Sequence, residues 1–172
     1  VHLYVHEDAD ESTCTQIILN SKVQRPGVCN ALETLIIHEN IYKKIGKEII
    51  NSLLENEVEL FVDPKIKLDF PNLQEADKIH YETEFHDLKL AIKIVNSSDE
   101  AILHIQKYST GHTESILTSS DAEAEKFSKL IDSSVVFINA STRFTDGEMF
   151  GFGAEIGIST QKLHVRGPMG LE

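Results

Sequence analysis

The residue best suited to covalent chemistry is Cys29. It follows a Pro-Gly break at 26–27 and precedes a short apolar run at 32–37, which predicts a turn between a helix and a buried strand. A cysteine thiolate is a strong nucleophile, and a nearby cation or helix N-terminus increases the thiolate fraction. Cys29 is therefore a candidate nucleophile, although most cysteines are inert small hydrophobes.

Two cations lie close to Cys29 in the sequence, whereas the other cysteine has a different predicted role. Lys22 and Arg25 precede it closely, and we expect them to receive anionic ligands there. Cys14 lies within a helical pattern and is predicted to pack in the core.

A second polar stretch, Asn-Ala-Ser-Thr-Arg-Phe at 139–144, follows a predicted strand directly. In open α/β sheets, ligands gather at the carboxyl ends of the strands. Ser141, Thr142 and Arg143 are therefore candidates for binding an anion, Arg143 through two parallel N–H groups. A turn carrying a surface arginine explains the same residues equally well.

The histidines, the cysteine spacing and the glycines at 151–157 give weaker indications of a functional site. The eight histidines lack ligand spacing and the two cysteines stand 15 residues apart, so no metal site is expected. His112 is predicted on a turn, where a capping or solvated role and an active-site role both stay open. The stretch at 151–157 looks like a dinucleotide fingerprint, but its last glycine comes one residue late and no βαβ unit follows. A glycine-rich loop is favoured.

The elements that must position these residues alternate between strands and helices. Apolar runs predict strands at 1–5, 32–37, 58–62, 88–95, 113–117 and 135–138. Helical spacing predicts helices from residue 8 and at 41–53, 99–108 and 121–131. This alternation favours an α/β fold with a mostly parallel sheet and helices on both faces. Residues 64–87 are expected to be mostly loop, and the glycine-rich stretch after 139 a long functional loop.

Composition narrows the class of protein. The 172 residues carry 16 Lys and Arg against 28 Asp and Glu, a net charge of −12, which argues against nucleic acid and anionic membranes as partners. No apolar run approaches the ~20 residues that span a bilayer, and two cysteines fit a reducing cytosol. The chain opens without Met, directly in a strand pattern, and we interpret it as a fragment of a longer polypeptide.

Long motifs point to a family. Residues 23–35, which read Val-Gln-Arg-Pro-Gly-Val-Cys-Asn-Ala-Leu-Glu-Thr-Leu, and residues 139–147 and 152–171 resemble the γ-glutamyl phosphate reductases. This family, also called glutamate-5-semialdehyde dehydrogenases, is the proline-biosynthesis branch of the aldehyde dehydrogenase superfamily. Residues 84–95 and 111–114 fit it too, so the resemblance covers essentially the whole chain.

The resemblance implies an aldehyde dehydrogenase-like catalytic domain over residues 1–172. A nucleotide-binding domain would precede it and a C-terminal tail would follow it, and both are absent from this chain. Cys29 would be the nucleophile, and the backbone N–H groups of Cys29 and Asn30 the local oxyanion donors.

The resemblance also implies the substrate and cofactor residues. Ser141, Thr142, Arg143 and Phe144 would line the substrate tunnel, with Arg143 on the phosphate or the α-carboxylate. Glu84 would approach the cofactor's ribose.

The implied reaction is NADPH-dependent reduction of γ-glutamyl phosphate to glutamate-5-semialdehyde and phosphate through a Cys29 thioester. NADPH would be bound mainly by the absent domain, so the fragment alone is expected to be inactive. Glutamate kinase would supply the substrate, and the intact enzyme would be a cytoplasmic homo-oligomer. Two alternatives remain: the same domain within a bifunctional pyrroline-5-carboxylate synthase, and a non-catalytic, thiol-bearing binding or assembly module.

Overall fold

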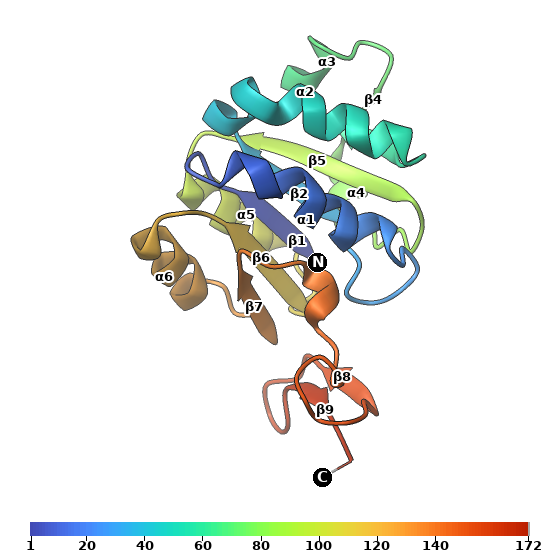
Figure 1. Ribbon diagram of the computed structural model, residues 1–172, viewed down its shortest axis with the longest axis vertical. Coiled ribbons are helices and arrows are strands. Elements are labelled where there is room, and N and C mark those ends of the chain that lie inside the picture. The colour runs from blue at the N-terminus through green and yellow to red at the C-terminus, as the bar shows by residue number, and fades with distance from the viewer. Residues whose placement is uncertain (172) are drawn as a thin grey trace.

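A parallel sheet forms the centre of the computed structural model, which describes residues 1–171 (Figure 1). Within that range the sheet has seven strands in the order β4–β3–β5–β2–β1–β6–β7, and every neighbouring pair runs parallel. The strands are β1 (His2–Val5), β2 (Thr34–His38), β3 (Glu59–Val62), β4 (Gln74–Glu75), β5 (Lys89–Val95), β6 (Thr113–Leu117) and β7 (Val135–Ile138). The prediction of a parallel sheet is confirmed.

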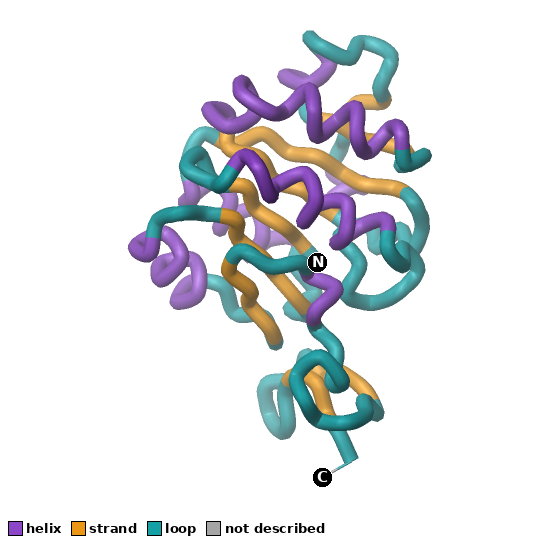
Figure 2. Tube along the Cα trace, viewed as in Figure 1, coloured by secondary structure: helices purple, strands orange, loops and turns teal. Residues whose placement is uncertain are grey.

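Helices cover both faces of the sheet, as predicted (Figure 2). The helices α1 (Glu11–Val23) and α2 (Glu39–Glu55) pack on one face, and α5 (Ser98–Tyr108) and α6 (Asp121–Leu130) on the other. Successive side chains of a strand point to opposite faces. Leu3 and Val5 of β1 therefore join the apolar cluster under α1 and α2, while Tyr4 joins the cluster under α5 and α6.

Side-chain caps fix where the long helices begin. Asp10 accepts a hydrogen bond from the Ser12 N–H at 3.0 Å, so α1 begins at Glu11 rather than near residue 8 as predicted. Ser97 and Ser120 cap α5 and α6 in the same way.

Two segments predicted as loops contain short elements. Residues 64–87 hold α3 (Pro64–Lys67), the edge strand β4 and α4 (Lys78–Glu82). Asp63 caps α3, and Asp77 forms a capping box with His80 at α4. These elements are too short to show an apolar period, so periodicity alone did not reveal them.

The glycine-rich end of the chain is also more regular than predicted. It holds the 3₁₀ turn η1 (Thr142–Phe144) and an antiparallel ribbon of β8 (Gly157–Ser159) and β9 (Gly167–Met169). This β8–β9 ribbon projects from the edge of the main sheet (Figure 1).

A buried ion pair closes the connection between α1 and β2. Lys22 Nζ lies 3.1 Å from Glu33 Oε2, and the Lys22 side chain is fully buried. Burial lowers the pKa of Lys22, and the Glu33 carboxylate opposes that shift. The other carboxylate oxygen of Glu33 accepts a hydrogen bond from the His86 N–H at 3.2 Å. The pair therefore joins three segments that are distant in sequence.

Lys22→Met is expected to lower the free energy of unfolding by about 3–5 kcal/mol, because it leaves the Glu33 carboxylate buried without its cation. Adding Glu33→Gln should restore most of this loss, since the amide removes the charge and its oxygen still accepts from His86. Denaturant unfolding measures both. The control is Lys89→Met, which breaks the exposed Lys89–Glu59 pair at 3.0 Å and should change stability far less. Equal losses for the two methionine variants would contradict the role assigned to the buried pair.

Candidate active site

Cys29 lies on the turn that connects α1 to β2, as predicted, and its residue is exposed. Because β2 begins at Thr34, Cys29 stands at the amino-terminal edge of the sheet. Cys14 on α1 is only 1% exposed and belongs to the core cluster. Burial raises the pKa of Cys14 to about 11, so the prediction of a packing role for this cysteine is confirmed.

The segment after β7 reverses direction and reaches the same edge. Asn139 has a left-handed backbone, with φ of 54°, and its side-chain amide holds both the N–H and the carbonyl of Thr118 at 2.9 Å. The chain then runs back along β6, so that the Thr145 hydroxyl lies 2.8 Å from that of Thr113 at the start of β6. Ser141, Thr142, Arg143 and Phe144 were expected at the carboxyl ends of the strands. That expectation is wrong, because the reversal at Asn139 carries them to the amino edge.

Asn30 and Arg143 meet beside Cys29. The Arg143 Nη1 group donates to Asn30 Oδ1, and Asn30 Nδ2 donates to the Thr145 carbonyl at 2.7 Å. Burial raises the pKa of the Cys29 thiol, and the charge of the Arg143 guanidinium opposes part of that rise. The Arg143 Nε atom is buried and has no hydrogen-bond partner among residues 1–171.

The four residues at 141–144 divide into a buried pair and a pair with accessible side chains. Ser141 is buried, and its hydroxyl accepts hydrogen bonds from the Ser21 hydroxyl at 3.0 Å and from the Arg143 N–H at 3.2 Å. Thr142 is fully buried. Phe144 remains 41% exposed. Arg143 and Phe144 therefore offer surface to a ligand, whereas Ser141 and Thr142 hold the turn.

Glu84 lies at the same edge of the sheet as Cys29, because it precedes β5, which begins at Lys89. Burial chiefly raises the pKa of the Cys29 thiol, and the Glu84 carboxylate adds to that rise. Its Oε1 atom accepts a hydrogen bond from the Thr110 hydroxyl at 3.1 Å, and its side chain is 44% exposed. The segment that carries it touches the cysteine turn: a Cβ placed on Gly27 would lie 3.5 Å from the His86 carbonyl oxygen. The accessible carboxylate of Glu84 can accept a hydrogen bond that a sugar hydroxyl donates.

Lys22 and Arg25 were both expected to receive anions beside Cys29, and for Lys22 this prediction is wrong. Its side chain is fully buried against Glu33, so it cannot contact a ligand at Cys29. Arg25 is exposed. Burial chiefly lowers the pKa of Arg143, and the charge of Arg25 adds to that shift. The positive charge at this edge comes from Arg25 and Arg143.

The pKa of the Cys29 thiol is raised, opposite to the shift that nearby cations alone would give. Partial burial is the largest cause, and the Glu155 carboxylate adds to it. The thiol's own backbone N–H and the Arg143 guanidinium oppose the rise without cancelling it. The surroundings of Cys29 in this structure therefore favour the thiol over the thiolate.

Sequence reasoning missed Glu155 as a neighbour of Cys29. Its Oε2 atom accepts a hydrogen bond from the Gly147 N–H at 2.8 Å, which fastens the glycine-rich segment to the turn after η1. No spacing in the chain relates position 155 to position 29, so only the folded loop could reveal the effect of Glu155 on the Cys29 thiol.

The weaker patterns resolve as follows. Gly151 and Gly153 have positive φ values of 82° and 72° in a loop, and Gly157 opens β8, so the predicted glycine-rich loop is confirmed and a dinucleotide fingerprint is not formed there. His112 is buried, and its Nδ1 atom lies 2.8 Å from the Thr113 hydroxyl. Within the described part of the chain, no three His, Cys, Asp or Glu side chains are grouped to hold a metal ion. No helix there is both long enough and apolar enough to cross a bilayer.

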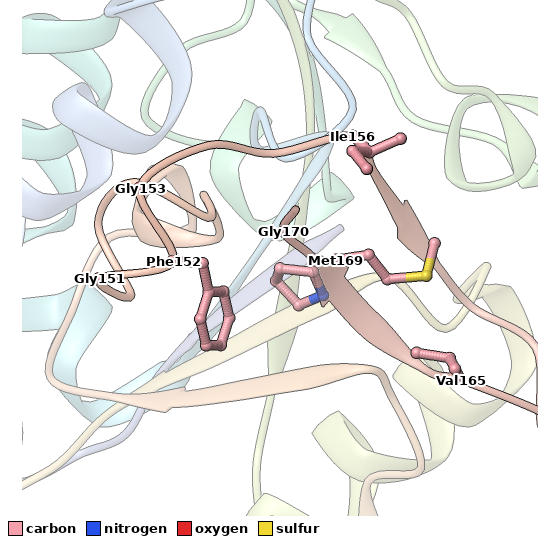
Figure 3. Close-up of a pocket in the computed structure, with 8 residues that line it drawn as sticks. Gly151, Phe152, Gly153, Ile156, Val165, Met169 and Gly170 are labelled. Carbon is pink, nitrogen blue, oxygen red and sulfur yellow. The ribbon is translucent and has the colours of Figure 1, made fainter. Parts of the chain in front are cut away.

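A cavity of about 670 Å³ lies between the loop at 151–153 and the β8–β9 ribbon (Figure 3), and neither Cys29 nor Arg143 lines it. Phe152, Ile156, Val165 and Met169 are among the eight residues that line it. None of those eight has a charged or nucleophilic side chain. The cavity is therefore an apolar hollow rather than the site of a reaction at Cys29.

The sheet, its helices and a cysteine at its amino edge define an aldehyde dehydrogenase-like fold. An acetylating aldehyde dehydrogenase from Geobacillus thermoglucosidasius superposes with a TM-score of 0.62 at 17% identity, covering 94% of this chain and 43% of its own. The γ-glutamyl phosphate reductase of Thermotoga maritima superposes with a TM-score of 0.96 at 50% identity, covering 99% of this chain and 41% of its own.

A curated γ-glutamyl phosphate reductase from Heliobacterium modesticaldum is 54% identical over 170 residues, which are 99% of this chain and 41% of that protein. The predicted resemblance to γ-glutamyl phosphate reductase is therefore confirmed. The chain spans about two fifths of the length of the curated relatives it matches. No family model matches the chain.

Alkylation of Cys29 tests the electrostatics of the site. Arg143→Gln should raise the thiol pKa and slow alkylation at neutral pH, because it removes a charge that stabilises the thiolate. Glu155→Gln should lower the pKa and speed alkylation, because it removes an opposing charge while its amide oxygen can still accept from Gly147. Iodoacetamide pH–rate profiles, read by mass spectrometry of the Cys29 peptide, measure both, and Cys14 serves as a slow internal control. Shifts of the same sign in the two variants would contradict the assignment.

Proposed function

We propose that this chain is the cysteine-bearing catalytic domain of a γ-glutamyl phosphate reductase, which converts γ-glutamyl phosphate to glutamate-5-semialdehyde and phosphate in proline biosynthesis. The observation that carries the proposal is the exposed Cys29 beside Arg143 in a chain that is 54% identical to such an enzyme along nearly its whole length. The remaining part of the enzyme would include the nucleotide-binding domain. In support, residues 1–171 contain no glycine fingerprint between a strand and a helix.

The reaction begins at the sulfur of Cys29. Its thiolate attacks the acyl carbon of γ-glutamyl phosphate, and the bond from that carbon to the phosphate oxygen breaks, so phosphate leaves with the electron pair and a thioester remains. Burial raises the pKa of the thiol, and the substrate itself is dianionic, so the reaction at this sulfur needs positive charge beside it. Arg143 and Arg25 supply it in this proposal.

Negative charge that develops on the acyl oxygen needs hydrogen-bond donors. We assign this role to the N–H groups of Cys29 and Asn30, since neither donates to a backbone carbonyl among residues 1–171. We assign Arg143 to the phosphate or the α-carboxylate of the substrate, and Phe144 to the wall beside it. Ser141 and Thr142 support these two residues from within the turn.

A nicotinamide cofactor, NADPH in this proposal, supplies the hydride that reduces the acyl group to the aldehyde. Glu84 is the residue of this chain that fits it, as an accessible carboxylate that can accept a hydrogen bond from a ribose hydroxyl. When the aldehyde is released, Cys29 regains its thiolate. We further propose that the intact enzyme is a cytoplasmic homo-oligomer that receives its substrate from glutamate kinase.

The test uses the full-length enzyme in the reverse direction, as phosphate-dependent reduction of NADP⁺ with glutamate-5-semialdehyde. Cys29→Ala should reduce turnover by on the order of a thousandfold or more, because it removes the proposed nucleophile and Cys14, the other cysteine of the sequence, is buried in the core. Cys14→Ala is the matched control and should retain turnover. Wild-type turnover in Cys29→Ala would refute the nucleophile, and a wild-type enzyme without phosphate-dependent turnover would favour a non-catalytic thiol module.

A further inference from the structure

The side chain of Asn30 lies between two kinds of partner. Its Oδ1 atom accepts from Arg143 Nη1, while its Nδ2 group donates to the Thr145 carbonyl at 2.7 Å and lies 3.5 Å from the Arg143 carbonyl. Asn30 is 4% exposed, so this arrangement is shielded from water. Both ends of the amide are therefore used, and neither is available to a substrate.

Only a primary amide satisfies these partners. A guanidinium group only donates and a backbone carbonyl only accepts, so the residue between them needs an acceptor and a donor on one short side chain. An aspartate would place its second oxygen against the Thr145 carbonyl, and a leucine would leave both partners without a hydrogen bond. The partners also fix which end of the amide is oxygen.

The backbone of this turn has other anchors. The Ser21 hydroxyl donates to Ser141 at 3.0 Å and accepts from the Thr142 N–H at 3.3 Å, and Thr113 contacts Thr145 at 2.8 Å. Loss of Asn30 would thus leave the turn in place while freeing the guanidinium. A free arginine has many rotamers, and ordering it on ligand binding costs entropy.

We infer that Asn30 is a positioning residue, which orients the Arg143 guanidinium beside Cys29 so that it can receive the anionic group of the substrate. The inference rests on the proposed function for the identity of that anion. It assigns the side chain of Asn30 a role separate from that of its backbone N–H. In this role Asn30 acts on the substrate only through Arg143.

A double-mutant cycle in the full-length enzyme tests this dependence. Arg143→Gln should raise the KM for phosphate or for the semialdehyde, and Asn30→Leu should raise the same KM by about tenfold, with a smaller effect on kcat. In the Arg143→Gln background, Asn30→Leu should change that KM by less than about twofold. An undiminished effect in that background would overturn the inference. Asn30→Ser provides the same comparison if the leucine variant does not fold.

A second readout needs no turnover. Iodoacetate is anionic and iodoacetamide is neutral, so the ratio of their rates at Cys29 reports the positive charge held beside the sulfur. Asn30→Leu and Arg143→Gln should both lower this ratio severalfold. Asn96→Leu is the matched control: it makes the same change of side chain just after β5, at the opposite edge of the sheet, and should keep the wild-type ratio.

The two readouts separate the possible failures. An unchanged ratio in Asn30→Leu, with a lowered ratio in Arg143→Gln, would show that Asn30 does not orient the guanidinium. A wild-type enzyme without phosphate-dependent turnover would refute the proposed function, while the alkylation ratio would still decide the role of Asn30.

Discussion

The ion pair between Lys22 and Glu33 holds together the two chain segments on which the site is built. It fastens the end of α1 to the start of β2 and so closes the turn that presents Cys29. Through its second oxygen, Glu33 also holds the backbone at His86, next to the segment that carries Glu84. Closing a loop with a buried charge pair costs desolvation free energy, because each ion loses its hydration. Its benefit is geometric: neither partner can move without exposing the other, so the positions of the cysteine turn and the Glu84 segment depend on each other.

The layered fold was largely predictable, because β2, β5 and α2 bury long apolar runs or stripes whose period appears directly in the sequence. The elements within 64–87 were not. They are set by local caps such as Asp63 and Asp77, which act over a few residues and produce no periodic signal. The β8–β9 ribbon was missed for a similar reason, since strands of three residues that contain glycine and proline do not alternate measurably.

Within the candidate site, the turn position of Cys29 followed from its neighbours in sequence, whereas its electrostatics did not. Lys22 is near Cys29 in sequence, but its ammonium group is paired with the buried Glu33 carboxylate. Glu155 is far from Cys29 in sequence, but its carboxylate adds to the rise in the thiol pKa. The pairing of Asn30 with Arg143 depends on the reversal at Asn139, which a single left-handed residue produces. Asparagine tolerates that conformation better than most residues, but nothing in the sequence states that it adopts it here.

Because Cys29 lies at the amino edge of a parallel sheet, the peptide dipoles of the neighbouring helices give a negative electrostatic potential around it. Helices that connect parallel strands run opposite to them, so α1, α5 and α6 all end at this edge, at Val23, Tyr108 and Leu130. A helix C-terminus carries a partial negative charge from its unpaired carbonyls. Many anion sites in α/β proteins rely on the opposite helix end, where backbone N–H groups attract the ligand. Here the peptide dipoles disfavour an anion, and attraction depends on the side-chain charges of Arg25 and Arg143. Affinity at this edge can therefore be changed by altering one arginine or its support, without disturbing the scaffold.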